Sequence, residues 1–255
     1  MSLFGFLKRK EKFGDYPPLQ SYSAFGTDIH SHLIPGIDDG VKTIEESLEM
    51  IRGLSRLGFR KLITTPHVMS DGYRNTASNI LAGLKHVQDA VAAENIPVII
   101  DAAAEYYFDE GFFRKLESEP ILAINSKYLL FEISYINSPE RILEVVFAII
   151  VKGYTPLLAH PERYPFWFSK FDEYHRIKEA GALFQLNTNS LVGYYGGAVK
   201  QTAQRLVDEN LIDFIGSDLH GSRHLQALHN TLDEKYLWKL AALGLKNASL
   251  IVDKK

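Results

Sequence analysis

The stretch TDIHSHLIPGIDDG, residues 27–40, begins like a buried strand and ends in a turn punctuated by proline and glycine. Two histidines, His30 and His32, are separated in it by one residue. Because alternate side chains of a strand point to the same face, these two imidazoles share one face, as metal chelation requires. The same spacing also arises by chance, so its meaning depends on partners elsewhere in the chain.

Strand-like and helix-like stretches alternate along the rest of the chain. The strand-like stretches are short, apolar and rich in β-branched residues, which is typical of strands buried on both faces. Between the first two, Ile44, Leu48, Ile51 and Leu54 follow a helical spacing, and Thr43 stands where a helix cap is expected. The candidate strands are residues 25–31, 59–66, 97–107, 127–134, 155–161, 183–189 and 213–220.

Seven alternating β–α units imply a parallel sheet. At 255 residues, a closed α/β barrel is favoured over an open doubly wound sheet. The chain has no internal repeat, no low-complexity tract and no change in composition that would mark a second domain. We therefore expect a single domain built on a barrel.

The composition is that of an ordinary globular protein, with 46% hydrophobic and 23% charged residues. The formal net charge of -3 argues against a nucleic-acid binder that relies on bulk charge. Cysteine is absent, which excludes disulfides, thiolate zinc sites and any phosphatase that uses a cysteine nucleophile.

The N-terminus, MSLFGFLKRKEKFG, mixes apolar residues with lysine and arginine. It lacks the long apolar segment and the small-residue cleavage site of a secretory signal. No apolar run in the chain reaches the roughly 18 residues needed to span a bilayer, so a cytoplasmic location is expected. The segment is interpreted either as an arm with weak membrane-surface or partner affinity, or as a tail without such a role.

Titratable residues gather at the carboxyl ends of the predicted strands, which in a parallel barrel meet at one face. Taken singly, each has a structural explanation, although a buried glutamate such as Glu132 is costly unless it is paired or metal-bound. Imidazoles together with carboxylates suit manganese, iron or zinc better than calcium or magnesium. So many ligands imply two or three ions and a multinuclear hydrolase. The candidates are His30, His32, His67, Glu105, Glu132, His160, Asp218 and His220.

The segments DIHSHLIPGIDDG, TPH, AEYY, FEIS, AHPER and SDLH, in that order, resemble the PHP (polymerase and histidinol phosphatase) superfamily. Within it, the chain is most similar to the manganese-dependent protein-tyrosine phosphatases of bacterial capsule and exopolysaccharide operons. The resemblance implies a distorted, seven-stranded TIM-like α/β barrel. That domain would occupy residues 27–255 and follow an N-terminal extension, residues 1–26.

The resemblance also implies three divalent metal ions, of which manganese is the first choice and iron or zinc the alternatives. By motif position, the first ion is assigned to His30, His32, Glu105 and Asp218. The second is assigned to Glu105, as a bridging ligand, with Glu132 and His160. The third is assigned to Asp39, His67 and His220.

The three aspartates of the opening stretch receive different roles. Asp39 is the preferred ligand by motif position, with Asp38 as the alternative. Asp28 lies two residues before His30 and is expected to orient that histidine rather than bind metal. Pro35 and the neighbouring glycines are expected to provide the tight return that brings Asp39 to the barrel mouth.

Two arginines match residues that hold phosphate in the resembled phosphatases, Arg163 of AHPER and Arg223 of HGSRH. A planar bidentate donor suits a phosphate, although a surface ion pair is the alternative reading of each. The expected reaction is in-line attack on phosphorus by a metal-bridged hydroxide, without a covalent phosphoenzyme. The proton for the leaving tyrosinate is assigned either to His67 or to a metal-bound water.

The resemblance implies a phosphotyrosine tail of a membrane-associated polysaccharide-export kinase as substrate. A small-molecule phosphatase, such as a histidinol-phosphate phosphatase, is the first alternative, and a non-catalytic metal-stabilised regulatory module is the second. The oligomeric state stays open. The stretch VMSDGYRNT, residues 68–76, departs from the resembled pattern, so no substrate contact is assigned to it. YPFWF (residues 164–168) and LVGYYGG (residues 191–197) are candidate rim elements.

Overall fold

A computed structural model describes residues 16–251. The basic, apolar N-terminal arm expected from the sequence, residues 1–14, lies outside these residues. The proposed boundary between an extension, residues 1–26, and a barrel domain, residues 27–255, stays a prediction.

All the strands of the described chain pair in parallel, in two sheets. The first sheet has the order β1-β2-β4, formed by β1 (Thr27–Asp28), β2 (Lys61–Thr64) and β4 (Ile99–Ala102). The second has the order β3-β5-β6-β7-β8-β9. Its strands are β3 (His67–Val68), β5 (Glu105–Tyr107), β6 (Tyr128–Glu132), β7 (Thr155–Ala159), β8 (Leu183–Asn187) and β9 (Phe214–Gly216).

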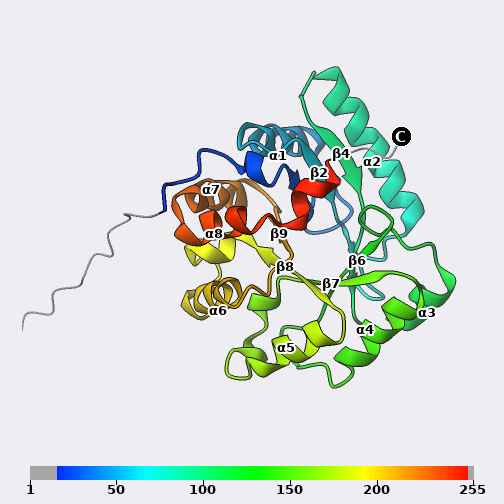
Figure 1. Cartoon of the computed structure of the whole chain (residues 1–255). Helices are drawn as coiled ribbons and strands as arrows, with labels where there is room; N and C mark the ends of the chain where they lie inside the picture. The colour runs from blue at the N-terminus through cyan, green and yellow to red at the C-terminus, as the bar shows by residue number, and fades with distance from the viewer. Residues whose placement is uncertain (1–15, 252–255) are drawn as a thin grey trace, which may run out of the picture.

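Helices surround these strands (Figure 1). The α-helices are α1 (Ile44–Arg56), α2 (Ala77–Ala93), α3 (Phe112–Ser118), α4 (Ile142–Val151), α5 (Asp172–Glu179), α6 (Gly197–Asp208), α7 (Ser222–Asn230) and α8 (Lys235–Leu243). Short 3-10 helices are η1 (Tyr22–Ala24), η2 (Pro161–Arg163), η3 (Pro165–Trp167), η4 (Thr188–Val192), η5 (Thr231–Asp233) and η6 (Lys246–Leu250). The side-chain oxygen of Thr43 accepts a hydrogen bond from Glu46 N at 3.3 Å, so Thr43 caps α1 as the sequence predicts.

The predicted parallel α/β fold is confirmed, since each of the seven predicted stretches contains a strand. The predicted distorted, seven-stranded barrel is not confirmed, because the strands fall into two sheets. The second β segment breaks after Thr64, where Thr65 N donates to Ser31 O at 2.7 Å and Pro66 has no N–H to offer a ladder. The third breaks between β4 and β5. These interruptions divide the strands into two sheets.

The core explains why polar residues collect at one end of the strands. A compact apolar cluster inside the curled sheets includes Tyr128 and Leu130 of β6 together with Leu157 of β7. Because side chains two residues apart share a face, Glu132 continues the face of Tyr128 and Leu130 beyond this cluster. A larger cluster packs the helices against the outer faces of the strands. The inner face is therefore apolar at the amino end and polar at the carboxyl end.

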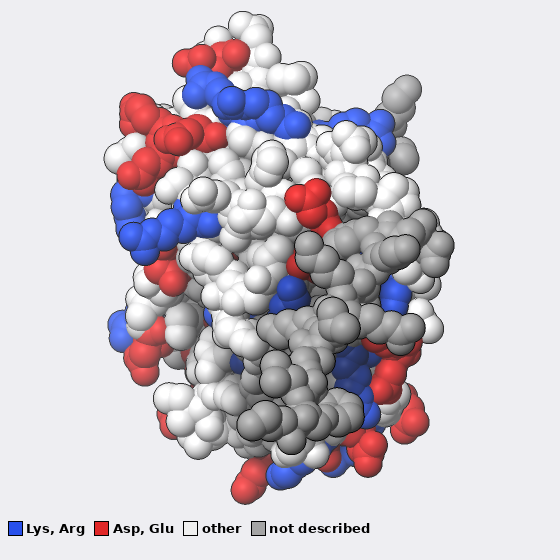
Figure 2. Space-filling model, turned by 90° about the vertical axis from the view of Figure 1, so that its left-hand side faces the viewer, with Lys and Arg blue, Asp and Glu red and all other residues white. Residues whose placement is uncertain are grey.

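On the face shown in Figure 2, acidic and basic side chains lie close to one another and neither sign forms a broad continuous field. This distribution agrees with the modest net charge of -3. Among residues 16–251, none of the helices is both long enough and apolar enough to cross a membrane.

Candidate metal centre

Nine side chains that can bind metal converge at the carboxyl ends of the strands. They fall into four overlapping groups, in each of which the ligand atoms lie within 4.8 Å of one another. Within residues 16–251 these groups contain the nine residues proposed from the sequence and no others. The nine are His30, His32, Asp39, His67, Glu105, Glu132, His160, Asp218 and His220.

Glu105, at the start of β5, lies at the centre of the cluster and is fully buried. Its Oε2 atom lies 3.1 Å from Nε2 of His30 and 3.1 Å from Nδ1 of His67. The same oxygen is 3.6 Å from Nε2 of His32, and Oε1 is 3.1 Å from Nε2 of His160. One carboxylate thus faces four imidazoles, an arrangement suited to a ligand shared between ions.

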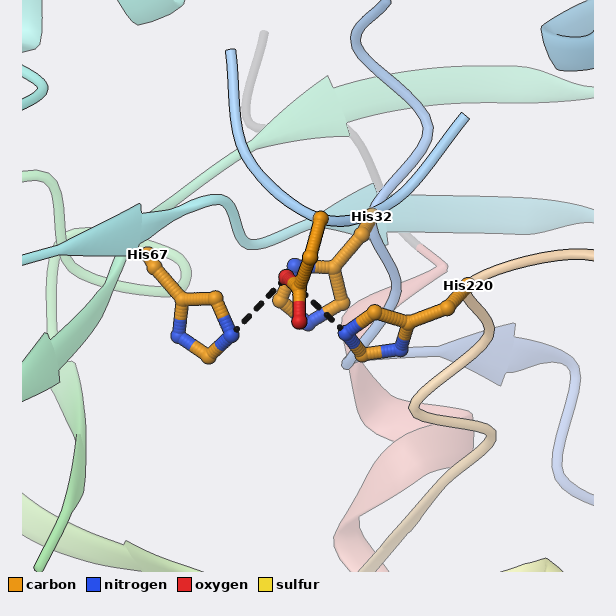
Figure 3. A group of neighbouring side chains, drawn as sticks. His32, His67 and His220 are labelled. Carbon is orange, nitrogen blue, oxygen red and sulfur yellow. Dashed lines mark ion pairs between the residues drawn. The ribbon is translucent and has the colours of Figure 1, made fainter. Parts of the chain in front are cut away.

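A second group lies nearer the surface and contains His32, Asp39, His67 and His220. Oδ1 of Asp39 lies 3.4 Å from Nε2 of His67 and 3.4 Å from Nε2 of His220. The rings of His32 and His220 stack with their centroids 4.0 Å apart. Figure 3 shows the three labelled imidazoles gathered around these two ion pairs. The structure places His32 in this group as well as in the inner one.

Asp218 and Glu132 complete the cluster, each beside a different pair of histidines. Oδ1 of Asp218 is 3.4 Å from the Nε2 atoms of both His30 and His32. Oε1 of Glu132 is 3.3 Å from Nδ1 of His67, and its Oε2 is 3.7 Å from Nε2 of His160.

Several candidate ligand atoms of this cluster are buried and make no hydrogen bond of good geometry, although they lie close to one another. They are Nε2 of His30, Nε2 of His32, Nδ1 of His67 and Oε2 of Glu105. Buried polar atoms without partners are rare in proteins because each lacks the hydrogen bond it would make in water. Coordination to a cation would satisfy all four, so the donor set fits a metal centre.

The electrostatics of the cluster favour positive charge. Burial alone would lower the pKa of His30 and of His67, because it disfavours the imidazolium. The carboxylate of Glu105 opposes this effect, and the pKa rises to about 10 for His30 and to about 12 for His67. The cluster therefore attracts protons and metal ions alike, and metal binding weakens as the pH falls.

Two side chains contact the Nδ1 atoms of His30 and His32. Nδ1 of His30 lies 2.7 Å from Oε1 of Gln185, and Nδ1 of His32 lies 2.7 Å from Oδ2 of Asp38. These contacts leave both Nε2 atoms facing the carboxylates, as metal ligation requires. Asp38 thus lies outside the ligand groups, whereas Asp39 lies within one. Sequence reasoning did not identify Gln185, whose only signal is a polar residue inside an apolar strand.

The imidazole of His30 is contacted by Gln185, whereas Asp28 is hydrogen-bonded to the backbone of His30 and to Ser217, so the expected side-chain contact between Asp28 and His30 is not found. The carboxylate of Asp28 accepts hydrogen bonds from the backbone N of Ser217 at 2.8 Å and from Oγ of Ser217 at 2.6 Å. Asp28 instead fixes the residue that precedes Asp218. The side chain of His30 is already held by Gln185.

The backbone around the ligands is unusual at two positions. His160 and Asp218 both adopt left-handed conformations, with φ of 34° and 48°. Such a conformation costs an L-residue roughly 1–2 kcal/mol, and it turns each side chain sharply at the end of its strand. Gly40 provides a close approach, since a Cβ there would lie 2.3 Å from the carbonyl oxygen of His32. The predicted tight return of the 35–40 segment therefore depends on this glycine.

The cluster forms the floor of a cavity of about 600 Å³. Arg163 lies in its wall, where its guanidinium is 2.8 Å from Oδ2 of Asp218. The same guanidinium lies 4.2 Å from the ring centroid of Tyr195 and 4.9 Å from that of Tyr135. The cavity is lined by Asp39, His67, Met69, Tyr73, Tyr107, Glu132, Tyr135, His160, Arg163, Tyr195, Asp218, His220 and His224.

The second candidate arginine is placed differently. Arg223 is exposed in the first turn of α7 and does not line this cavity. The structure thus brings Arg163 to the cluster and leaves Arg223 outside it, so a phosphate contact by Arg223 remains a prediction.

The two candidate rim elements also differ in whether they reach the cavity. In YPFWF, Tyr164 and Trp167 are buried in the core, which supports the structural reading of that stretch. In LVGYYGG, Tyr195 lines the cavity. Sequence reasoning gave no role to Tyr73, Tyr107 or Tyr135, because tyrosines that follow strands do not reveal from sequence alone whether they face a cavity or the core.

Residues 26–247 match the protein family described as "Capsular polysaccharide synthesis, CpsB/CapC". The tyrosine-protein phosphatase YwqE of Bacillus subtilis is 30% identical over 230 residues, which cover 88% of this chain and 91% of YwqE. The putative tyrosine-protein phosphatase CapC of Staphylococcus aureus is 26% identical over 230 residues, which cover 88% of this chain and 90% of CapC.

A solved structure from work on YwqE of Bacillus subtilis and CpsB of Streptococcus pneumoniae, described as "unique metal-dependent tyrosine phosphatases", has a TM-score of 0.75 to this chain. The two sequences are 29% identical, and the match covers 87% of this chain and 94% of that one. By the family match over residues 26–247, this chain belongs to the CpsB/CapC family of capsular polysaccharide synthesis.

Proposed function

We propose that this chain is a metal-dependent protein-tyrosine phosphatase whose mechanism does not use cysteine. The observation that carries the proposal is the convergence of nine ligand residues around Glu105, at the floor of a cavity whose wall holds Arg163. The absence of cysteine is consistent with hydrolysis that needs no covalent phosphoenzyme. Relatives named tyrosine-protein phosphatases that cover most of the chain support the same reaction.

The proposal includes three divalent ions, with manganese preferred and iron or zinc as alternatives. The sets proposed by motif position are His30, His32, Glu105 and Asp218 for the first, Glu105, Glu132 and His160 for the second, and Asp39, His67 and His220 for the third. The contacts of Glu105 with four imidazoles support its sharing between ions. Bound divalent ions would lower the pKa of a coordinated water, so that hydroxide is supplied near neutral pH.

The residues of the chain position the phosphoryl group. Arg163 would bind two of its oxygens, because a planar guanidinium matches phosphate geometry. Its ion pair with Asp218 and its contacts with the rings of Tyr135 and Tyr195 hold the guanidinium in one orientation. His67 has carboxylates near both ring nitrogens, so we assign it to metal binding rather than to protonation of the leaving tyrosinate.

We also propose that the two sheets act as one distorted barrel of seven β segments. The short gaps between β2 and β3 and between β4 and β5 support treating each pair as one segment. The parallel bridge between Ser31 and Leu219 supports contact between the first and last segments. Such an arrangement accounts for six segments delivering ligands to a single face.

The proposed substrate is a phosphotyrosine tail of a polysaccharide-export kinase, hydrolysed in the cytoplasm. The family description, which concerns capsular polysaccharide synthesis, supports this assignment. Tyrosines 73, 107, 135 and 195 give the cavity aromatic walls suited to an aryl phosphate.

Metal analysis combined with activity assays tests the proposal. Purified protein is assayed on a phosphotyrosyl peptide and on histidinol phosphate, before and after chelation, and after addition of Mn²⁺, Fe²⁺ or Zn²⁺. The proposal expects bound metal, loss of activity on chelation, recovery with a divalent ion and preference for the phosphotyrosyl peptide. Full activity of metal-free protein would overturn the mechanism, and a strong preference for histidinol phosphate would overturn the substrate.

A further inference from the structure

A short hairpin follows β3 at the edge of the metal cavity. Val68 and Arg74 form an antiparallel bridge, and Met69 N donates to Tyr73 O at 2.9 Å. Gly72 lies in the turn with φ of 83°, in the left-handed region that favours glycine. This hairpin is part of the 68–76 stretch, in which the proposed function uses only Tyr73, as part of the aromatic wall of the metal cavity.

The two sides of this hairpin face different cavities. Met69 and Tyr73 line the metal cavity, whereas their neighbours Ser70 and Arg74 line a second cavity of about 370 Å³. This division follows from extended backbone, in which successive side chains point to opposite sides. A peptide that reaches the metal cavity over this hairpin therefore also passes the second cavity.

The second cavity is basic. Its cationic residues are Arg74 of the hairpin and Arg114 and Lys115 of α3, and Glu119 is its one acidic residue. Within residues 16–251, no carboxylate lies at ion-pair distance from Arg114 or Lys115. Arg74 approaches Asp71 at 3.4 Å, but both side chains are largely exposed, and such pairs contribute little.

Lys115 is the strongest sign that the cavity takes an anion. It is only 9% exposed, and the one contact of its Nζ atom is with Oγ of Ser70 at 3.4 Å. Among the described residues, no carboxylate pairs directly with this ammonium, which reaches Asp109 only through the hydroxyl of Ser70. A buried ammonium without a directly paired anion is unfavourable, because it loses hydration without full compensation. An anion in this cavity would supply a compensating charge.

The walls of the cavity are fixed to one another before any ligand binds. Asp109 accepts hydrogen bonds from the backbone N of Ser70 at 2.5 Å, from Oγ of Ser70 at 2.8 Å and from Gly111 N at 2.9 Å. A Cβ on Gly111 would lie 2.1 Å from Oγ of Ser70, so any larger residue here would displace that hydroxyl. The hairpin and the start of α3 therefore form one preorganised unit.

We propose that the basic cavity of Arg74, Arg114 and Lys115 binds an anionic side chain of the substrate peptide, a carboxylate or a phosphoryl group, that flanks the phosphotyrosine. The inference rests on the proposed phosphatase function. An extended peptide advances about 3.3 Å per residue, so a side chain about three to four residues from the phosphotyrosine would lie roughly 10–13 Å from it. The cavity would therefore select substrates with acidic residues or further phosphotyrosines at that separation.

The experiment compares kcat/KM for three phosphotyrosyl peptides with that for p-nitrophenyl phosphate, all with the manganese-loaded protein. One peptide has neutral flanks, one has glutamates three and four residues from the phosphotyrosine on both sides, and one has a second phosphotyrosine there. We expect either anion to raise kcat/KM roughly 5–10-fold through KM, because the added contact is made equally in ground and transition states. The two anionic peptides show which source of negative charge the cavity prefers.

Substitutions assign this gain to the cavity. For each peptide, kcat/KM is divided by kcat/KM for p-nitrophenyl phosphate. In Arg114→Gln and Lys115→Met, this ratio for the anionic peptides should fall toward the ratio for the neutral peptide. Lys152→Gln is the matched control, because Lys152 is exposed at the end of α4 and lines neither cavity. Arg114 is also exposed, so its variant keeps the test decisive if Lys115→Met does not fold.

The failures are distinguishable. If the metal-loaded protein hydrolyses neither p-nitrophenyl phosphate nor the neutral peptide, the proposed function fails. If it hydrolyses both but anionic flanks give no gain, or if the gain survives Arg114→Gln, the inference about the basic cavity is overturned and the proposed function stands.

Discussion

His32 and Asp38 form a buried pair six residues apart, with Nδ1 of the imidazole 2.7 Å from Oδ2 of the carboxylate. Asp38 also accepts hydrogen bonds from Gly40 N at 3.0 Å and from His67 N at 3.3 Å. Burial would raise the pKa of Asp38, but the contact with His32 outweighs it and lowers the pKa. A single ionised carboxylate thus fixes His32, its return loop and the start of β3.

Asp38→Asn should weaken metal binding. An asparagine has only one acceptor oxygen for these three donors. Its NH2 group would face at least one of the donor N–H groups and could not accept a hydrogen bond from it. Loss of such an outer contact typically lowers metal affinity 10–100-fold. Metal content after dialysis against graded chelator measures the effect, and Asp89→Asn, at an exposed position of α2, is the control. Metal retention equal to that of the control would contradict this role for Asp38.

The two arginines proposed from the sequence can be separated by paired substitutions. Arg163→Lys keeps the charge but removes the bidentate fork, and kcat/KM for a phosphotyrosyl peptide should fall by roughly 10²-fold or more. Arg223→Lys should change it less than about twofold, because an exposed charge outside the cavity interacts weakly with the phosphate. Steady-state kinetics at two salt concentrations provides the comparison. Equal losses would show that Arg223 reaches the phosphate.

The location of the strands and the convergence of the nine candidate ligand residues could be predicted from the sequence. Short apolar runs ending in histidine or carboxylate are informative because parallel strands deliver their ends to one face. The breaks after Thr64 and before Glu105 could not be predicted, since the first depends on a hydrogen bond between Thr65 and the distant Ser31. Local propensity carries no information on such contacts.

The outer residues of the site were harder to predict for a physical reason. Gln185 and Tyr135 reach the cluster from elements far from the HSH motif, and in sequence they resemble ordinary polar and aromatic residues of strands and loops. Arg223 illustrates a different difficulty, because its contact with the phosphate stays untested. It lies three residues beyond a candidate ligand, but the first turn of α7 leaves it exposed, and spacing alone does not fix that direction.

His160→Asn should abolish most activity without unfolding the chain. Asparagine tolerates the left-handed conformation found at His160 better than most residues, so the turn at the end of β7 is retained. It removes an imidazole nitrogen that lies 3.1 Å from Glu105. We expect kcat/KM to fall more than about 100-fold with an unchanged circular dichroism spectrum. His175→Asn is the control, because His175 forms a surface pair with Glu209. If His160→Asn kept half of the parent activity, His160 would be excluded from the site.

Glu162 is expected to make stability depend on pH. It is fully buried, and its Oε1 accepts hydrogen bonds from Asn187 N at 3.0 Å and from Oγ of Ser190 at 2.6 Å. Its Oε2 has no partner. Burial, opposed in part by the bond from Ser190, raises the pKa of Glu162 from 4.5 to about 7. The folded state therefore retains the proton over a range in which the unfolded chain has lost it.

The sign of the effect follows from this difference. The stabilisation from Glu162 is fully present below pH 4.5 and is lost as the pH rises to about 7, a decrease in unfolding free energy of about 3 kcal/mol. Glu162→Gln keeps the accepting oxygen and cannot ionise, so it should lack this decrease. Urea unfolding of chelator-treated protein between pH 4.5 and 8 measures the unfolding free energy of variant and parent. The contributions of all other titrating groups cancel in the difference between the two. Glu179 is exposed on α5, so the unfolding free energy of Glu179→Gln should change with pH as that of the parent does. If the unfolding free energy of Glu162→Gln also changed with pH as the parent's does, Glu162 would be ionised in the folded protein throughout this pH range.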